Sequence, residues 1–138
     1  MSAFIDANLL IYLNASLDPE TRDLLEDFYI DVIAEYKAYT DILVLDELLY
    51  VSKHKYGVPY ELTLEFIESI VEPYVTLIPL NNAIYECFKK TLAQHNLKPS
   101  DTIHLCAMKL QGINVIISED KEFDKIHGIK RIWLPQQV

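Results

Sequence analysis

The stretch Ala3-Phe4-Ile5-Asp6-Ala7-Asn8 decides the fold of this chain, because a buried strand ends there in a carboxylate. Its first three residues are all apolar, which is typical of a strand buried on both faces of a parallel sheet. After Asp6 the apolar spacing of residues 9–13 favours a helix. Asp6 thus lies where open α/β sheets bind ligands. A lone Asp before a helix more often acts only as its cap, so the other acids must decide between the two roles.

Length and composition limit the classes of protein to which this chain can belong. The chain has 138 residues, of which 51% are hydrophobic and 24% charged, and this predicts one globular domain over residues 1–138. No apolar run is long enough to cross a bilayer, and no basic segment precedes the first one, so we expect neither a membrane anchor nor a signal peptide. Cys87 and Cys106 lack metal-site spacing, which indicates buried thiols in a reducing cytoplasm.

The formal net charge of −9 argues against a broad basic surface for nucleic acid. It is compatible with clustered acids that hold a cation, since the cation then meets the phosphate. A basic partner or a solvated acidic surface would give the same charge. The last third of the chain concentrates positive residues that either contact phosphates or form a solvated face: Lys98, Lys121, Lys125, Lys130 and Arg131.

Strands and helices alternate along the rest of the chain. Apolar residues at helical spacing, with Gly and Pro at the ends, predict helices over about 18–39, 45–56, 60–72, 84–95 and 99–111. Short apolar and β-branched runs predict further strands at 40–44, 74–78, 115–117 and 130–134. This alternation predicts a three-layer α/β/α fold with a mostly parallel central sheet of four to five strands.

Four acids share one position relative to this sheet. Asp6 and Asp120 each follow a buried strand, and Glu47 and Asp101 each lie near the start of a helix. These positions meet at one edge of a parallel sheet, so the four carboxylates can converge. They would repel one another and raise at least one pKa, and a divalent cation removes that penalty. Oxygen ligands suit Mg²⁺ or Mn²⁺, which can polarise a phosphodiester and activate a water molecule.

The order of these acids resembles that of the PIN-domain ribonucleases, and the chain is similar in size to the VapC toxins of prokaryotic toxin–antitoxin pairs. Four motifs carry the resemblance: Phe4–Asn8, Leu45–Leu48, Asp101–Ala107 and Ser118–Asp124. The resemblance implies that Asp6, Glu47, Asp101 and Asp120 are catalytic acids that hold Mg²⁺ or Mn²⁺ and hydrolyse RNA. Each motif alone is weak evidence, but four in the right order are strong evidence.

The same resemblance assigns supporting roles. Asn8 and Ser118 would orient Asp6, and Glu122 would be an outer acid that contacts the metal through water. Relatives carry Ser or Thr shortly before the position of Glu47, and Thr40 is the nearest candidate in this chain. The resemblance further implies a small antitoxin as partner and a homodimer, for which three tyrosines are the expected aromatic anchors: Tyr29, Tyr36 and Tyr39.

Other classes of protein fit less well. A haloacid-dehalogenase-like phosphotransferase would need a second acid where this chain has Asn8, and a dinucleotide-binding fold would need a glycine-rich turn after the first strand. The main alternative is an inactive PIN-like scaffold that only binds a protein partner. All four acids argue against it, because a site without chemistry has no reason to keep like charges together.

Polar neighbours of the motifs have plainer interpretations. Asp46 is expected to interact favourably with the dipole at the N-terminal end of its helix. Asp124 is expected to cap a turn or face solvent. His104 falls on the more polar side of its helix and is expected to be solvated. Tyr12 belongs to the core or an interface, or it stacks on a base beside the site.

Overall fold

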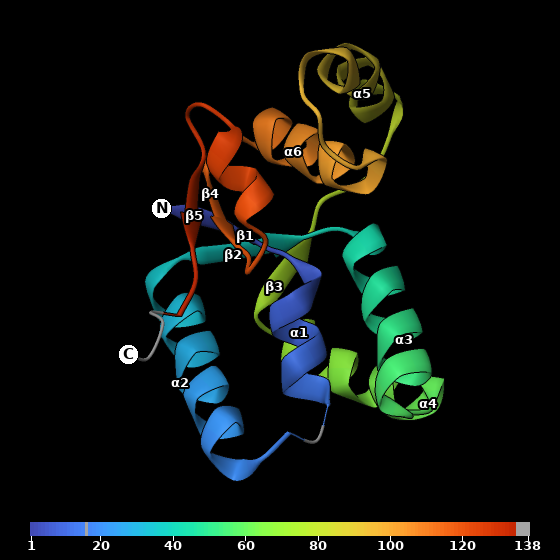
Figure 1. Ribbon diagram of the computed structural model, residues 1–138, viewed down its shortest axis with the longest axis vertical. Helices are drawn as coiled ribbons and strands as arrows, with labels where there is room; N and C mark the ends of the chain where they lie inside the picture. Colours follow the sequence, from blue (N-terminus) through green and yellow to red (C-terminus); the bar gives the residue numbers. More distant parts are fainter. Residues whose placement is uncertain (16, 135–138) are drawn as a thin grey trace.

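The strand β1 (Ser2–Ile5) is the centre of a five-stranded sheet in which all neighbouring strands are parallel (Figure 1). The computed structural model describes residues 1–15 and 17–134. The strand order is β3-β2-β1-β4-β5, with bounds β2 (Lys37–Thr40), β3 (Val75–Leu77), β4 (Val115–Ile117) and β5 (Lys130–Ile132). Helices cover both faces, which confirms the predicted three-layer α/β/α fold.

The apolar run in β1 explains its central place. Ala3, Phe4 and Ile5 have no exposed surface, as expected of a strand covered on both faces. Phe4 pairs with Tyr39 of β2 on one side and with Ile116 of β4 on the other. The core of the molecule therefore lies on both faces of β1.

Eight helical segments complete the fold in the part of the chain that the structure describes. The α-helices are α1 (Ala7–Asn14), α2 (Pro19–Glu35), α3 (Ile42–Tyr56), α4 (Tyr60–Phe66), α5 (Asn82–Gln94) and α6 (Pro99–Gln111), with a π-helical turn η1 (Ile67–Val71) and a 3₁₀ turn η2 (Lys121–Lys125). The helices α5 and α6 pack together on one side of the sheet, and α1 packs with α2 and α3 on the other (Figure 1). Gly57 and Gly112 end α3 and α6 with φ values of 72° and 73°, which only glycine adopts without strain.

The second strand lies earlier than its predicted position at 40–44. The helix before it ends at Glu35, and β2 occupies Lys37–Thr40 because the Lys37 N–H donates to the Met1 carbonyl at 2.9 Å and joins the chain to β1. The apolar run that follows is helical. Asp41 begins that helix, since its Oδ1 accepts the Val44 N–H at 3.1 Å.

Two of the tyrosines expected at a dimer interface belong to the core instead. Tyr29 and Tyr39 are 5% and 7% exposed, and the Tyr29 hydroxyl donates to the Ile70 carbonyl. Their prediction as interface anchors is wrong, because a residue buried within its own chain offers no surface to a partner.

The two cysteines are both shielded from solvent to some extent: Cys106 is buried and Cys87 half-buried. Within the described residues, no helix has both the length and the apolar character that spanning a membrane requires.

The strand order creates one topological switch point. From β1 the chain builds β2 and β3 on one side, and it then crosses back to build β4 and β5 on the other. Open α/β sheets bind ligands at the carboxyl ends of the two strands where the order reverses, here β1 and β4. Asp6 directly follows β1 and Ser118 directly follows β4. The fold thus brings two predicted site residues to that position.

Candidate active site

Asp6 is held by both of its carboxylate oxygens. Its Oδ1 accepts the N–H of Ala7 at 2.9 Å and caps α1, and its Oδ2 accepts the hydroxyl of Ser118 at 2.7 Å. Its backbone N–H donates to the Ile117 carbonyl at 3.0 Å, which extends the pairing of β1 with β4 by one residue. Asp6 is 5% exposed. It is therefore both a helix cap and a residue of the cluster described below.

The loop after β4 ties Asp120 to the same group. The Ser118 hydroxyl, which donates to Asp6, also accepts the backbone N–H of Asp120 at 3.1 Å. Asp120 is half-buried, and its Oδ1 accepts the N–H of Glu122 at 2.9 Å to begin η2. One hydroxyl thus links the segments that carry two of the four predicted acids.

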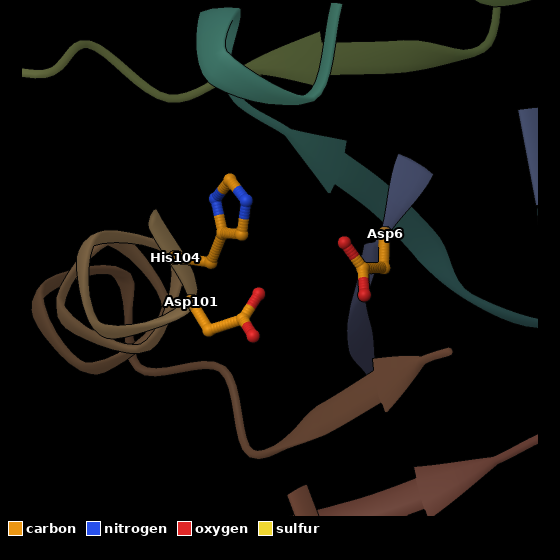
Figure 2. A group of neighbouring side chains, drawn as sticks. All are labelled: Asp6, Asp101 and His104. Atoms are coloured by element: carbon orange, nitrogen blue, oxygen red, sulfur yellow. The ribbon is translucent and has the colours of Figure 1, made fainter. Parts of the chain in front are cut away.

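Asp101 lies opposite Asp6, on the first turn of α6 (Figure 2). One carboxylate oxygen of each residue and one ring nitrogen of His104 lie within 4.8 Å of one another. Asp101 is 8% exposed, and burial together with the charges of Asp6 and Asp120 raises its pKa to about 6, although His104 and Lys98 oppose the shift. Two like charges are therefore held close together in a place where water solvates them poorly.

Glu47 stands at the border of this cluster, on the second turn of α3. Restricted access of water raises the pKa of its carboxyl, and the charge of Asp6 raises it further. Lys98 and His104 act in the opposite direction. Glu47 is exposed, and the three side chains that lie within 4.8 Å of one another do not include it.

A buried pair of Asp41 and His104 is the part of the site that the sequence did not reveal. The two side chains have exposures of 0% and 3%, and His104 Nδ1 lies 2.6 Å from Asp41 Oδ2. The prediction of a solvated His104 is therefore wrong. Burial lowers the pKa of His104, but the hydrogen bond to Asp41 and the charges of Asp41, Asp6 and Asp101 outweigh it and raise the pKa. Two signals were present in the sequence: an Asp at a helix start, and a His three residues after Asp101.

Three other residues lie around this group of acidic side chains and His104. Asn8 accepts the N–H of Glu119 at 3.2 Å, so it contacts the loop after β4 and not Asp6. Glu122 is exposed and forms an ion pair with Lys125. Thr40 is completely buried and donates to the Ile5 carbonyl at 2.8 Å, which joins the ends of β2 and β1 directly before Asp6.

The basic residues of the last third divide into two groups. Arg131 donates to both carboxylate oxygens of Asp124 at 2.9 and 3.2 Å, which lowers the pKa of Asp124, and Lys125 is paired with Glu122. Lys98 instead stands close enough to Glu47 and Asp101 to lower the pKa of both. A groove of about 740 Å³ runs beside β5 and is lined by Glu119, Lys121, Lys130, Arg131, Ile132, Trp133 and Leu134.

The donor set at the centre fits a divalent cation. Ligands on opposite sides of one ion stand about 4 Å apart, twice a bond length of roughly 2.1 Å. The Asp6, Asp101 and His104 donor atoms lie within 4.8 Å of one another, which is of the same order. A cation would also relieve the repulsion that raises the pKa of Asp101. Asp6 and Asp101 would hold the ion through carboxylate oxygens, and the ring of His104 lies beside them.

Comparison with solved structures found the same fold in several toxin–antitoxin systems. A chain of the VapBC2 complex from Rickettsia felis bound to a promoter DNA fragment has a TM-score of 0.72 at 14% identity, over 96% of this chain and 98% of that one. VapC20 of Mycobacterium tuberculosis, a toxin that cleaves the sarcin-ricin loop, has a TM-score of 0.71 at 15% identity, over 89% and 93%. A chain of a toxin–antitoxin complex from Klebsiella pneumoniae has a TM-score of 0.67 at 22% identity, and the match covers 93% of this chain and 95% of that one.

These likenesses establish the fold. A search of curated protein sequences found no match. The comparison with family profiles found one family, described as the PIN domain, over residues 3–129. That range includes β1 with Asp6, the starts of α3 and α6, and the loop after β4 that holds Asp120. The chain belongs to the PIN domain family.

Proposed function

We propose that this protein is a metal-dependent endoribonuclease and the toxin of a toxin–antitoxin pair that acts in the cytoplasm. The observation that carries the proposal is the convergence of buried acids at the switch point of the sheet, where Asp6 and Asp101 face one another and the pKa of Asp101 is raised to about 6. Such a cluster is unfavourable without a cation. The fold that it shares with a toxin that cleaves the sarcin-ricin loop supports RNA as the substrate.

The residues of the site have distinct tasks in this proposal. A bound Mg²⁺ or Mn²⁺ would polarise the scissile phosphodiester and lower the pKa of a water molecule. Asp6 and Asp101 would hold the ion, and Ser118 would keep the Asp6 carboxylate turned toward it through the hydrogen bond of 2.7 Å. Lys98 lies beside the acids and would attract the phosphate that the overall charge of −9 repels.

Cleavage of RNA should require a divalent cation. We expect the purified protein to cut a fluorophore-labelled single-stranded or hairpin RNA with Mg²⁺ or Mn²⁺, and to lose that activity when EDTA is added. Activity should return when Mn²⁺ is supplied in excess over EDTA. Cleavage that continues in EDTA would contradict the metal mechanism. A protein that binds Mn²⁺ and cuts no RNA would favour an inactive PIN-like scaffold.

Two apolar grooves offer surfaces for protein partners. One, of about 520 Å³, lies between α2 and the α4–η1 segment and includes Ile30, Phe66 and Tyr74. The other, of about 310 Å³, lies between α3, α5 and α6 and includes Phe88 and Tyr85. Tyr74 and Tyr85 are each 55% exposed. We propose that the first groove receives the antitoxin and the second forms a homodimer, since exposed aromatics of this kind anchor protein interfaces.

The purified chain is expected to be a homodimer in light scattering. Tyr85→Asp should shift it to the mass of a single chain, because a carboxylate would be placed in the apolar groove of α3, α5 and α6. The control is Tyr74→Asp, which alters an equally exposed tyrosine in the other groove and should leave the dimer intact. A wild-type protein that stays monomeric at tens of micromolar would contradict the dimer.

A further inference from the structure

The buried pair of Asp41 and His104 gives the cation site a nitrogen donor. We propose that His104 is a direct metal ligand through Nε2, oriented by Asp41, so that the site prefers Mn²⁺, Co²⁺ or Zn²⁺ over Mg²⁺. This inference rests on the proposed metal site and adds to it the identity of one ligand and the class of ion. Three observations carry it: the partner of Nδ1, the surroundings of Nε2 and the place of the pair in the fold.

The first observation fixes the tautomer of the ring. Asp41 Oδ2 lies 2.6 Å from His104 Nδ1, and Asp41 Oδ1 accepts the N–H of Val44 at 3.1 Å. An ionised carboxylate only accepts hydrogen bonds, so Nδ1 must carry the hydrogen. A cation that binds the ring displaces any proton from Nε2, and the lone pair of that nitrogen is then available to it. Metal-binding histidines typically donate their other N–H to a carboxylate in this way.

The second observation concerns Nε2 itself. His104 is 2% exposed, yet no hydrogen bond to Nε2 is present within residues 1–15 and 17–134. In the same part of the chain every completely buried side-chain nitrogen or oxygen has a hydrogen-bond partner. Nε2 must therefore keep a small solvent contact. Figure 2 shows the imidazole beside the facing carboxylates of Asp6 and Asp101, so that contact opens into the acidic cluster.

The third observation is the place of the pair in the fold. Asp41 is the cap of α3 and is completely buried, and His104 lies one turn after Asp101 on α6. The hydrogen bond between them joins the starts of the two helices that carry Glu47 and Asp101. A ligand held in this way needs little reorganisation to bind an ion. Imidazole favours Mn²⁺ and later transition metals over Mg²⁺, which prefers oxygen ligands and water.

The test measures metal binding and does not depend on activity. Mn²⁺ bound to the wild-type protein should show modulation from a directly coordinated ¹⁴N in pulsed electron paramagnetic resonance. His104→Asn should lose that signal. Its amide can still donate to Asp41 near the position of Nδ1, but no ligand replaces Nε2. By calorimetry this variant should bind Mn²⁺ about 10- to 100-fold more weakly, while Mg²⁺ affinity changes less than about threefold.

Control variants separate the possible outcomes. His127→Asn alters an exposed histidine and should keep the ¹⁴N signal. Asp41→Asn should weaken Mn²⁺ binding about tenfold, because the ring loses its charged partner. If wild-type protein binds Mn²⁺ without ¹⁴N modulation while Asp101→Asn does not bind it, His104 is not a ligand and the inference fails, although the proposed function stands. If wild-type protein binds no Mn²⁺, both fail. The ¹⁴N measurement uses wild-type protein. It therefore decides the question even if one of the variants does not fold.

Discussion

Replacement of Asp6 by asparagine is expected to lower the rate of RNA cleavage by roughly a thousandfold at saturating Mn²⁺. The amide removes one of the charges that hold the ion, and a cation contributes several kcal/mol to a phosphoryl transition state, with about 1.4 kcal/mol for each factor of ten. The fold should survive, because Asn is also a good helix cap and can accept the Ala7 N–H in place of Oδ1. Single-turnover cleavage of the labelled RNA measures the loss.

Two further variants make this result specific. Asp31→Asn removes an exposed acid on α2, and it should leave the cleavage rate unchanged. Ser118→Ala keeps all four acids but removes the hydroxyl that orients Asp6, and it should cost about 10- to 100-fold, mainly in Mn²⁺ affinity. A carefully purified Asp6→Asn protein that is folded and cuts RNA at near wild-type rate would show that Asp6 is a cap and nothing more.

The second large effect is on stability. Asp101→Asn should make the metal-free protein more stable at pH 8 by about 2 kcal/mol, measured by urea unfolding. The pKa of Asp101 rises from 3.8 in the unfolded chain to about 6 in the folded one. The unfolded state therefore ionises first, and stability falls as pH rises between these values, by about 3 kcal/mol for a shift of two units. The loss of one anionic neighbour of His104 offsets part of the gain.

The pH dependence distinguishes this cause from better packing. Below about pH 3 the carboxyl is protonated in both states, so the advantage of Asp101→Asn over wild type should disappear there. A gain of equal size at about pH 3 and at pH 8 would mean that repulsion in the cluster is not its source. The measurement needs EDTA throughout, because a bound cation reverses the effect.

Mn²⁺ supplies the complementary experiment. It should raise the melting temperature of the wild-type protein, since a ligand at a hundredfold excess over its Kd stabilises the folded state by about 2.7 kcal/mol. Asp101→Asn should weaken or abolish this shift. Glu20→Gln alters an exposed acid in the first turn of α2 and should leave it intact. If Mn²⁺ shifts Asp101→Asn as much as wild type, Asp101 is not part of the site.

The sequence predicts the architecture well because its strongest signals are local. The apolar run before Asp6 and the glycines after α3 and α6 place a buried strand and two helix ends without reference to the rest of the chain. The sequence does not reveal the boundary between α2 and β2, because no Gly or Pro occurs between Glu20 and Tyr56. The backbone pairing of Lys37 with Met1, a tertiary contact, decides that boundary.

The parts of the site that the sequence missed depend on distant residues. His104 lies on a helix that is apolar on nearly all sides, where a polar residue is expected to face water. Its partner Asp41 is 63 residues away in the chain, and only the folded structure brings the two together. Tyr29 was assigned to an interface for a similar reason, because the Ile70 carbonyl that satisfies its hydroxyl is 41 residues away. Local patterns identify candidate residues, but they do not identify such partners.

The hydrogen bond between Ser118 and Asp6 spans 112 residues and has a consequence for synthesis of the protein. The central strand β1 leaves the ribosome well before its neighbour β4 and the Asp120 loop, which are made more than a hundred residues later. Contacts of such long separation form late in folding. A nascent chain shorter than about Asp120 lacks both the strand and the hydroxyl that complete the site. A chain with the proposed activity would therefore be harmless to RNA until this segment has been made, and an antitoxin would need to bind it only after that point.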